Sequence, residues 1–186
     1  MQIESSDFVE AAEDGDLGEV RRLLAVRGRV VLLDTIDLGM TALHRAAQFG
    51  HAEVVQELLM VGMSPSVRDD RKRTPLHDAV SHIGSLFCLH VLVRSGALIE
   101  GCDVYGNTPL MEAASNSNVA AVVYLLDRDA NPQKINRRGM TPLDLAEYQL
   151  EGFGYGVDPK HKEHAVDLMN IKLFLADATS RRLRTD

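Results

Sequence analysis

Short apolar stripes of helical spacing alternate with glycine or polar turns along most of the chain. Residues 41–49 place Leu43, Ala46 and Ala47 on one face of a predicted helix. Residues 52–60 form a second predicted helix after Gly50, and its apolar face consists of Val54, Val55, Leu58 and Leu59. Because each helix pair alone leaves its apolar faces exposed, this pattern predicts pairs that stack on one another.

A four-residue motif recurs at an almost constant period. Its copies are Thr41-Ala42-Leu43-His44, Thr74-Pro75-Leu76-His77, Thr108-Pro109-Leu110-Met111 and Thr141-Pro142-Leu143-Asp144. The threonines at 41, 74, 108 and 141 are 33, 34 and 33 residues apart. Threonine is a good helix N-cap, and proline, present in three copies, suits the first helical position. Each copy therefore predicts the start of a helix.

This motif and its period resemble the ankyrin repeat. The resemblance is specific over residues 36–147, weaker over 7–30, and lapses over 149–186. It implies an all-α solenoid of helix–turn–helix repeats, with β-turn fingers that project from one edge. About four full repeats are expected, plus an N-terminal capping repeat.

The period divides residues 1–186 into a single predicted domain. Its predicted parts are an N-terminal capping repeat at 7–35, repeats at 36–68, 69–102 and 103–135, a C-terminal capping repeat at 136–178 with an insertion at 149–159, and a tail at 179–186. The second helix of the last repeat is expected at about 160–177. Because both ends look capped, we expect a complete array that is a monomer.

Four positions depart from the repeated pattern. Lys72 replaces the glycine expected two residues before the threonine, which predicts a differently shaped second finger. Met111 and Asp144 replace the motif histidine, so the turn-bridging hydrogen bond that the family implies is expected to be lost in those copies. Asp129 stands where two earlier repeats have glycine, and we expect it to adopt the left-handed conformation.

Composition and charge narrow the function classes. Hydrophobic residues make up 45% and charged residues 25%, as in an ordinary globular protein. The net charge of −7 argues against nucleic-acid binding, which needs a basic face. The sequence has no long apolar run and begins with polar, acidic residues, so we expect no membrane span or secretory signal and a cytoplasmic location, with the nucleus as an alternative. Cys88 and Cys102 are expected to be reduced thiols, with a single disulfide as the alternative.

The sequence contains no motif for a catalytic nucleophile, a phosphate-binding loop or a zinc protease. We therefore expect no enzyme activity, no catalytic residues, no cofactor and no metal. His161 and His164 have metal-ligand spacing but lack a third ligand. The glycine-rich stretch at 152–156 predicts a surface loop, which is either a contact patch or an insertion without function. The second interpretation is favoured.

Residue types typical of protein interfaces gather at the predicted finger tips and at the ends of the first helices. The family resemblance implies that these positions line a concave face that contacts partners. Arginine, methionine and aromatic side chains are enriched at interfaces. The predicted partner-binding residues are Leu38, Met40, Phe49, Asp70, Arg71, Arg73, His82, Tyr105, Asn107, Arg137, Arg138 and Met140. The basic tips favour an acidic protein or peptide partner, although they could instead serve solubility alone.

We therefore predict a non-catalytic protein–protein interaction module that acts as an adaptor, scaffold or inhibitor. One alternative is a regulatory subunit or domain of an enzyme system. Another is a pathogen effector or toxin-neutralising protein that uses the same surface. Fold alone does not decide among these functions.

Overall fold

The computed structural model describes residues 5–28, 35–81, 86–152 and 162–182. The chain falls into two compact units, Met1–Val104 and Tyr105–Asp186. The boundary lies inside the third predicted finger, between Val104 and Tyr105. The assignment of residues 1–186 to one domain therefore stays a prediction.

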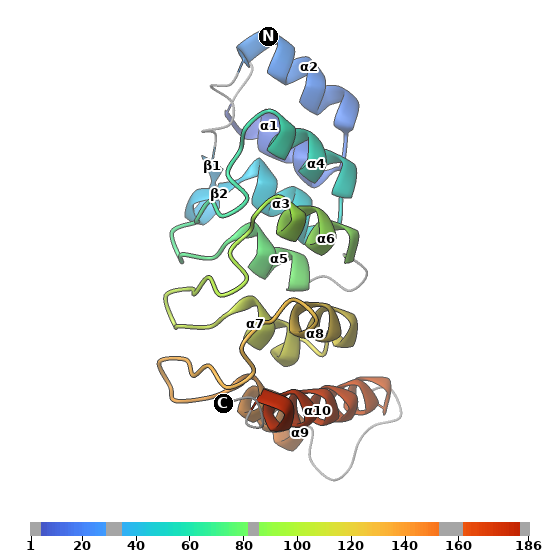
Figure 1. Ribbon diagram of the computed structural model, residues 1–186. Coiled ribbons are helices and arrows are strands. Elements are labelled where there is room, and N and C mark those ends of the chain that lie inside the picture. Colours follow the sequence, from blue (N-terminus) through green and yellow to red (C-terminus); the bar gives the residue numbers. More distant parts are fainter. Residues whose placement is uncertain (1–4, 29–34, 82–85, 153–161, 183–186) are drawn as a thin grey trace. The chain divides into compact units, whose positions relative to one another are not determined.

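Unit 1 contains helix pairs in which each first helix packs on the next first helix (Figure 1). Helix α1 (Ser5–Glu13) packs against α3 (Ala42–Gln48), and α3 packs against α5 (Pro75–Ser81). The second helices form the other layer, in which α4 contacts both neighbours. These second helices are α2 (Leu17–Arg27), α4 (Ala52–Met60) and α6 (Leu86–Arg94). Among the described residues, unit 1 is thus two layers of helices, as the repeat pattern predicts.

The first finger closes on itself through a short β-ladder. Strand β1 (Thr35–Ile36) pairs antiparallel with β2 (Met40–Thr41), and the 3-10 turn η2 (Asp37–Gly39) joins them. Thr41 pairs with Thr35 and Met40 with Ile36. The turn therefore holds the finger tip at a fixed place above the start of α3.

Unit 2 repeats the arrangement with α7 (Pro109–Ser115), α8 (Val119–Leu126), α9 (Pro142–Gly152) and α10 (Lys162–Arg182). Helix α9 packs on α7, and α10 packs on both α8 and α9. Helix α9 continues to Gly152, so the first four residues of the predicted insertion at 149–159 are helical. Residues 153–159 lie outside the described part of the chain. Helix α10 begins close to its predicted start but continues to Arg182, which makes residues 179–182 of the predicted tail helical.

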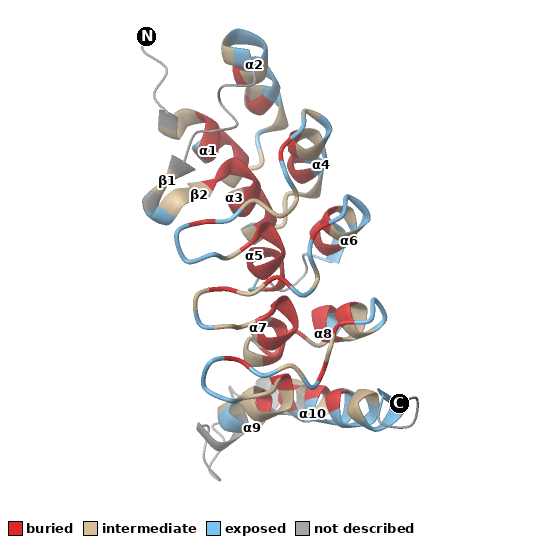
Figure 2. Cartoon of the chain, turned by 60° about the vertical axis from the view of Figure 1, so that its left-hand side comes forward, coloured by how far each residue is buried: buried red, intermediate tan, exposed pale blue. Residues whose placement is uncertain are grey.

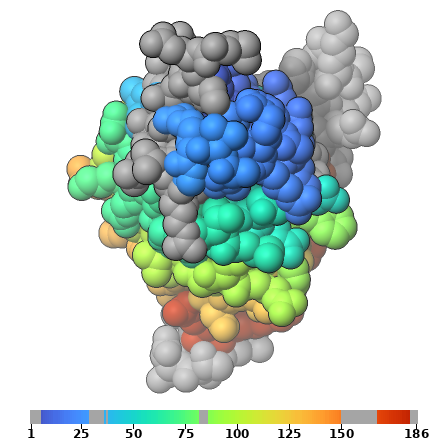
Figure 3. Space-filling model, turned by 90° about the horizontal axis from the view of Figure 1, so that it is seen from above, coloured from blue at the N-terminus to red at the C-terminus, as the bar shows by residue number. Residues whose placement is uncertain are grey.

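The core of each unit lies between its helix layers, where buried residues line the facing sides of the ribbons (Figure 2). Ala46 and Ala47 of α3 are fully buried, and their small side chains allow close approach of neighbouring first helices. Leu58 of α4 is also fully buried. In Figure 3, α1 and α2 form much of the face of unit 1 that is turned toward the viewer. Phe8 and Leu23 point their fully buried side chains inward from these two helices.

Two of the positions that depart from the repeated pattern, Asp129 and Lys72, adopt left-handed backbone conformations. Asp129 has a φ of 62°, which confirms the left-handed conformation expected there. Lys72 has a φ of 61°, close to the 71° of Gly39 and the 73° of Gly139 at the same place in other repeats. The prediction of a differently shaped second finger was therefore wrong at this residue. The amide of Lys72 donates to the carbonyl of Asp69 (2.9 Å), and this turn holds the lysine in a conformation that favours glycine.

Candidate partner-binding site

The base of the first full repeat's finger is held by His44. The backbone amide of Thr41 donates to Nδ1 of His44 at 3.2 Å, so the ring proton resides on Nε2. Nε2 in turn donates to the carbonyl of Arg73 in the next finger, also at 3.2 Å. Burial lowers the pKa of His44 and keeps the ring neutral, as this pair of bonds requires. His44 therefore connects two successive fingers.

The same motif position is used differently in the later repeats. His77 accepts from the Thr74 amide at 3.1 Å, as His44 does in its own repeat. Met111 contributes only its backbone amide, which donates to the Thr108 hydroxyl at 3.3 Å. In the last repeat, Asp144 accepts from both the amide and the hydroxyl of Thr141, each at 2.7 Å. Within the described residues neither the Met111 nor the Asp144 side chain bonds to another finger, as predicted, and Asp144 replaces only the histidine's bond within its own turn.

Arg73 is a structural residue, although the sequence pattern assigned it to the partner-binding set. Its guanidinium contacts the carboxylate of Asp78 (3.0 Å) and donates to the Ser81 hydroxyl (3.3 Å). The side chain of Asp78 is only 4% exposed and that of Arg73 only 19%. A buried carboxylate needs such a partner, because burying an unpaired charge is very costly. The Arg73 cation therefore has a structural role beside Asp78, and its assignment to the partner-binding set stays a prediction.

Backbone hydrogen bonds join neighbouring fingers within each unit. In unit 1 the amide of Asp70 donates to the carbonyl of Leu38, and the amide of Val104 donates to the carbonyl of Arg71, both at 2.9 Å. In unit 2 the amide of Arg137 donates to the carbonyl of Tyr105, also at 2.9 Å. These bonds hold the finger tips in register, so the side chains on them project from a fixed backbone.

The tips in unit 1 expose both apolar and cationic groups. Leu38 at the first tip is 47% exposed, and Phe49, at the C-terminal end of α3, is 40% exposed. Arg71 and Lys72 are also exposed. Asp70 is exposed beside them, while Met40 is half-buried at the end of the β-ladder. Most of the predicted partner-binding residues of unit 1 are therefore exposed, and their shared role stays a prediction. His82 lies outside the described residues.

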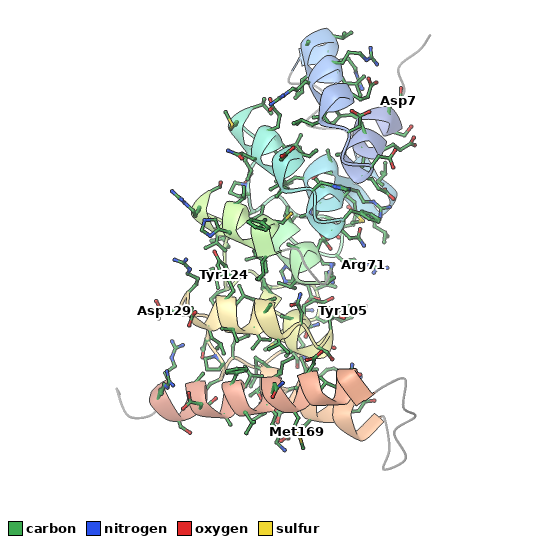
Figure 4. All side chains as sticks on the ribbon, turned by 90° about the vertical axis from the view of Figure 1, so that its right-hand side faces the viewer. Asp7, Arg71, Tyr105, Tyr124, Asp129 and Met169 are labelled. Atoms are coloured by element: carbon green, nitrogen blue, oxygen red, sulfur yellow. The ribbon has the colours of Figure 1, made fainter. Side chains whose placement is uncertain are left out.

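The tips in unit 2 have a similar character. Tyr105 is 62% exposed, and Figure 4 shows it at the finger edge, opposite Asp129 at the far side of this unit. Arg137 and Arg138 are exposed, and Met140 is half-buried. Asn107 accepts a hydrogen bond from the side-chain amide of Asn136 at 2.9 Å, which ties it to the next finger. Asn107 is thus half-buried and has a structural contact in addition to its predicted role.

The described residues offer little for catalysis or metal binding. No group of three or more His, Cys, Asp or Glu side chains among them is placed to hold a metal ion. Cys88 and Cys102 are free thiols, and burial raises the pKa of Cys88 to about 12, so its reactive thiolate is suppressed. None of the helices in the described ranges combines the length and apolar character that crossing a bilayer requires.

The model of the family described as ankyrin repeats (3 copies) matches residues 8–100 and 96–153. This chain belongs to the ankyrin-repeat family. Ankyrin repeats are protein–protein interaction modules. The repeats that begin with the four threonine motifs have the ankyrin fold.

Several ankyrin-repeat relatives are much longer than this chain. An L-asparaginase of Dirofilaria immitis is 31% identical over 159 residues, which cover 68% of this chain and 27% of that protein. The transient receptor potential cation channel subfamily A member 1 of Homo sapiens is 30% identical, with 74% and 12% covered. The E3 ubiquitin-protein ligase XBAT32 of Arabidopsis thaliana is 34% identical, with 64% and 23% covered. The chain thus spans 27% or less of each of these three proteins.

Sequence reasoning missed the buried polar residue that shapes the ankyrin finger turns. Asp69, Asp103 and Asn136 each precede the motif threonine by five residues, and each is nearly buried. Asp69 accepts from the Arg73 amide at 2.7 Å, and Asn136 accepts from the amides of Arg138 and Met140. A signal was present, because Asp or Asn recurs at this place with the repeat period. These side chains satisfy the turn amides.

Proposed function

We propose that this ankyrin-repeat chain binds an acidic protein or peptide through its finger tips, as an adaptor, scaffold or inhibitor without catalytic activity of its own. One observation carries the proposal. The tips expose cationic and apolar side chains, whereas their backbone is fixed by bonds from finger to finger. A surface that is ordered before binding loses little conformational entropy when a partner arrives.

The charges on the tips support an acidic partner. Arg71 and Lys72 form no ion pair within the described residues of unit 1, and the same is true of Arg137 and Arg138 in unit 2. The chain as a whole is acidic, with a net charge of −7, whereas these four tip residues are exposed cations. Opposite charges across an interface steer encounter and select the partner. Leu38 and Tyr105 add exposed apolar surface beside these cations.

The test is an affinity capture with a tip variant that keeps the structural residues. The variant carries Arg71→Glu, Lys72→Glu, Tyr105→Ala and Arg138→Glu, and it leaves Arg73 in place to pair with Asp78. The native chain is expected to retain a partner that the folded variant loses. The matched control reverses Arg22, an exposed arginine of α2 that pairs with Glu19 far from the finger turns in sequence.

The outcomes separate the two explanations for the basic tips. A partner that binds the native chain and the Arg22→Glu control, but not the tip variant, supports the binding surface. A partner that binds all three equally contradicts it. If no partner is lost but the tip variant precipitates, the tips serve solubility instead.

The greater length of the relatives supports a related function, in which the repeats are a recruiting domain of a larger protein. The ankyrin repeats of a larger protein could recruit a partner for that protein's other activities, including an enzymatic one. A regulatory domain of an enzyme system would use the same tips. We propose a cytoplasmic setting, where the two free thiols would stay reduced.

A further inference from the structure

A groove of about 530 Å³ lies in unit 1 between the C-terminal halves of α4 and α6. Its walls come from the second helices and the turn after α4, and none of the predicted partner-binding residues lines it. The groove is therefore separate from the finger tips, although both belong to unit 1. It is large enough for two or three side chains of a partner.

In the described part of the chain, five apolar and four polar side chains line the groove. The apolar ones are Leu59, Met60, Met63, Pro65 and Val91, and the polar ones are Gln56, His90, Arg94 and Ser95. Met60 is 74% exposed, which is unusual for a large apolar side chain on a helix of a stable unit. Methionine is flexible and adapts to different partner shapes, so it is common at peptide-binding surfaces.

Helix α6 extends this surface beyond the groove. Phe87 is 76% exposed and begins a stripe that continues through Val91 to Arg94, at spacings of four and three residues. The stripe runs alongside the groove for two helical turns. Phe87 does not line the groove itself, and its exposed ring adds apolar surface at the N-terminal end of the same helix.

Among the described residues, the groove has one charged side chain, that of Arg94, and no carboxylate lines it. Arg94 lies in the last turn of α6, where a cation also offsets the helix dipole. That structural role accounts for Arg94 but leaves the exposure of Met60 and Phe87 unexplained. A cationic apolar groove in an acidic chain is complementary to a segment that carries apolar and acidic residues.

We propose that this groove docks a short amphipathic segment of another protein, with two apolar anchors and at least one carboxylate. Helix α4 has nine residues and is therefore about 13 Å long, which matches apolar side chains one or two turns apart on a docked helix. The anchors lie against Met60, Met63 and Val91, and the carboxylate faces Arg94. Since the groove is separate from the finger tips, the chain can hold two segments at once.

The test is a selection from a phage library of random twelve-residue peptides on the full chain. Peptides that combine apolar residues with Asp or Glu are expected to be enriched. The strongest is then synthesised and its affinity measured for the native chain and for two variants, Met60→Gln and Arg94→Glu. Each substitution is expected to weaken binding about tenfold. Both residues are exposed, so the variants are expected to keep the native fold.

Two matched controls place the bound peptide. Val26→Gln changes another exposed apolar residue, on α2, and Arg71→Glu changes a finger tip. Neither substitution is expected to weaken peptide binding. When the peptide binds, the methyl NMR signals of Met60 and Met63 are expected to shift, whereas that of Met40 is not. Enriched peptides that lack carboxylates, or that bind the Arg94→Glu and Met60→Gln variants as well as the native chain, overturn the proposal. Failure to enrich any peptide over the Met60→Gln, Arg94→Glu double variant overturns it too. If only Arg71→Glu abolishes peptide binding, the peptide binds at the finger tips: the groove proposal is overturned and the proposed function is supported.

Discussion

The base and the tip of each finger are only a few residues apart, yet they differ sharply in burial and bonding. At the base of unit 1, His44 is fully buried and holds two hydrogen bonds to backbone groups. At the tip, Arg71 is exposed and forms no ion pair within the described residues. The contrast is sharpest between Arg71 and Arg73, which are identical in chemistry and two residues apart.

Under the proposed function, one short motif serves both the fold and recognition. The base is fixed by burial, so its residues are exchangeable only for others that satisfy the same backbone groups. The tip has no such constraint, and its side chains can change without loss of the fold. Substitutions that affect only the base or only the tip are therefore the most informative.

The largest expected effect is the loss of the Arg73 cation. Arg73→Ala leaves Asp78 buried without its main partner, so we expect the free energy of unfolding to fall by about 3 kcal/mol. Arg71→Ala is expected to change it by less than about 0.5 kcal/mol. Urea denaturation of both variants measures the difference. Equal losses in the free energy of unfolding would contradict the distinction between base and tip.

Lowering the pH should destabilise the base of the finger through protonation of His44. Since burial lowers the pKa of folded His44, the unfolded chain takes up its proton first as the pH falls below the ordinary value of 6.5. The stabilising contribution is complete above that pH and is lost as the pH falls toward the lowered folded value, at a rate of at most about 1.4 kcal/mol per pH unit. His44→Met copies the residue of the third repeat, and it should reduce the fall in stability between pH 7 and pH 5. An unchanged pH profile in this variant would contradict a buried neutral histidine.

Backbone strain at the tip should have a smaller effect. Lys72 adopts a φ of 61°, so Lys72→Gly is expected to stabilise the chain by about 1 kcal/mol. The converse control is Gly139→Ala, which has open space for its new Cβ and a φ of 73°. It should destabilise by a similar amount through the backbone alone. Thermal unfolding checks both, and a destabilised Lys72→Gly would show that the lysine side chain contributes to the fold.

The smallest expected effect on stability comes from reversing tip charges. Arg71→Glu and Arg138→Glu are each expected to change the free energy of unfolding by less than about 0.5 kcal/mol, because both side chains are exposed. Denaturation with urea provides the value. A loss as large as that of Arg73→Ala would mean that the tips, too, hold the fold together.

The sequence predicted the local features well because they depend on nearby residues. The N-cap threonines, the boundaries of α4 and the left-handed Asp129 all follow from short-range patterns. Lys72 was misjudged, because hydrogen bonds within and between fingers outweigh its own conformational preference. The structural role of Arg73 was not predicted, because its ion-pair partner Asp78 lies on the following helix. The presence of Asp78 among the apolar residues of α5 was a usable sign, since a buried carboxylate requires a cation.

The groove between α4 and α6 could not be predicted in the same way. It depends on how two helices separated by more than twenty residues pack side by side, and no repeated motif marks it. The tip residues are an intermediate case. Their place in the repeat was predictable, whereas their exposure and the fixed backbone beneath them required the structure.

Site-specific photo-crosslinking tests the central claim, that the finger tips contact a protein partner, most directly. A photoreactive amino acid is placed at Leu38, Arg71 or Tyr105, and at exposed Ala25 of α2 or Ala120 of α8 as controls. We predict that tip positions capture one discrete partner and that Lys72→Glu with Arg138→Glu abolishes the capture. Capture of the same partner from the control positions but not from the tips would contradict the account.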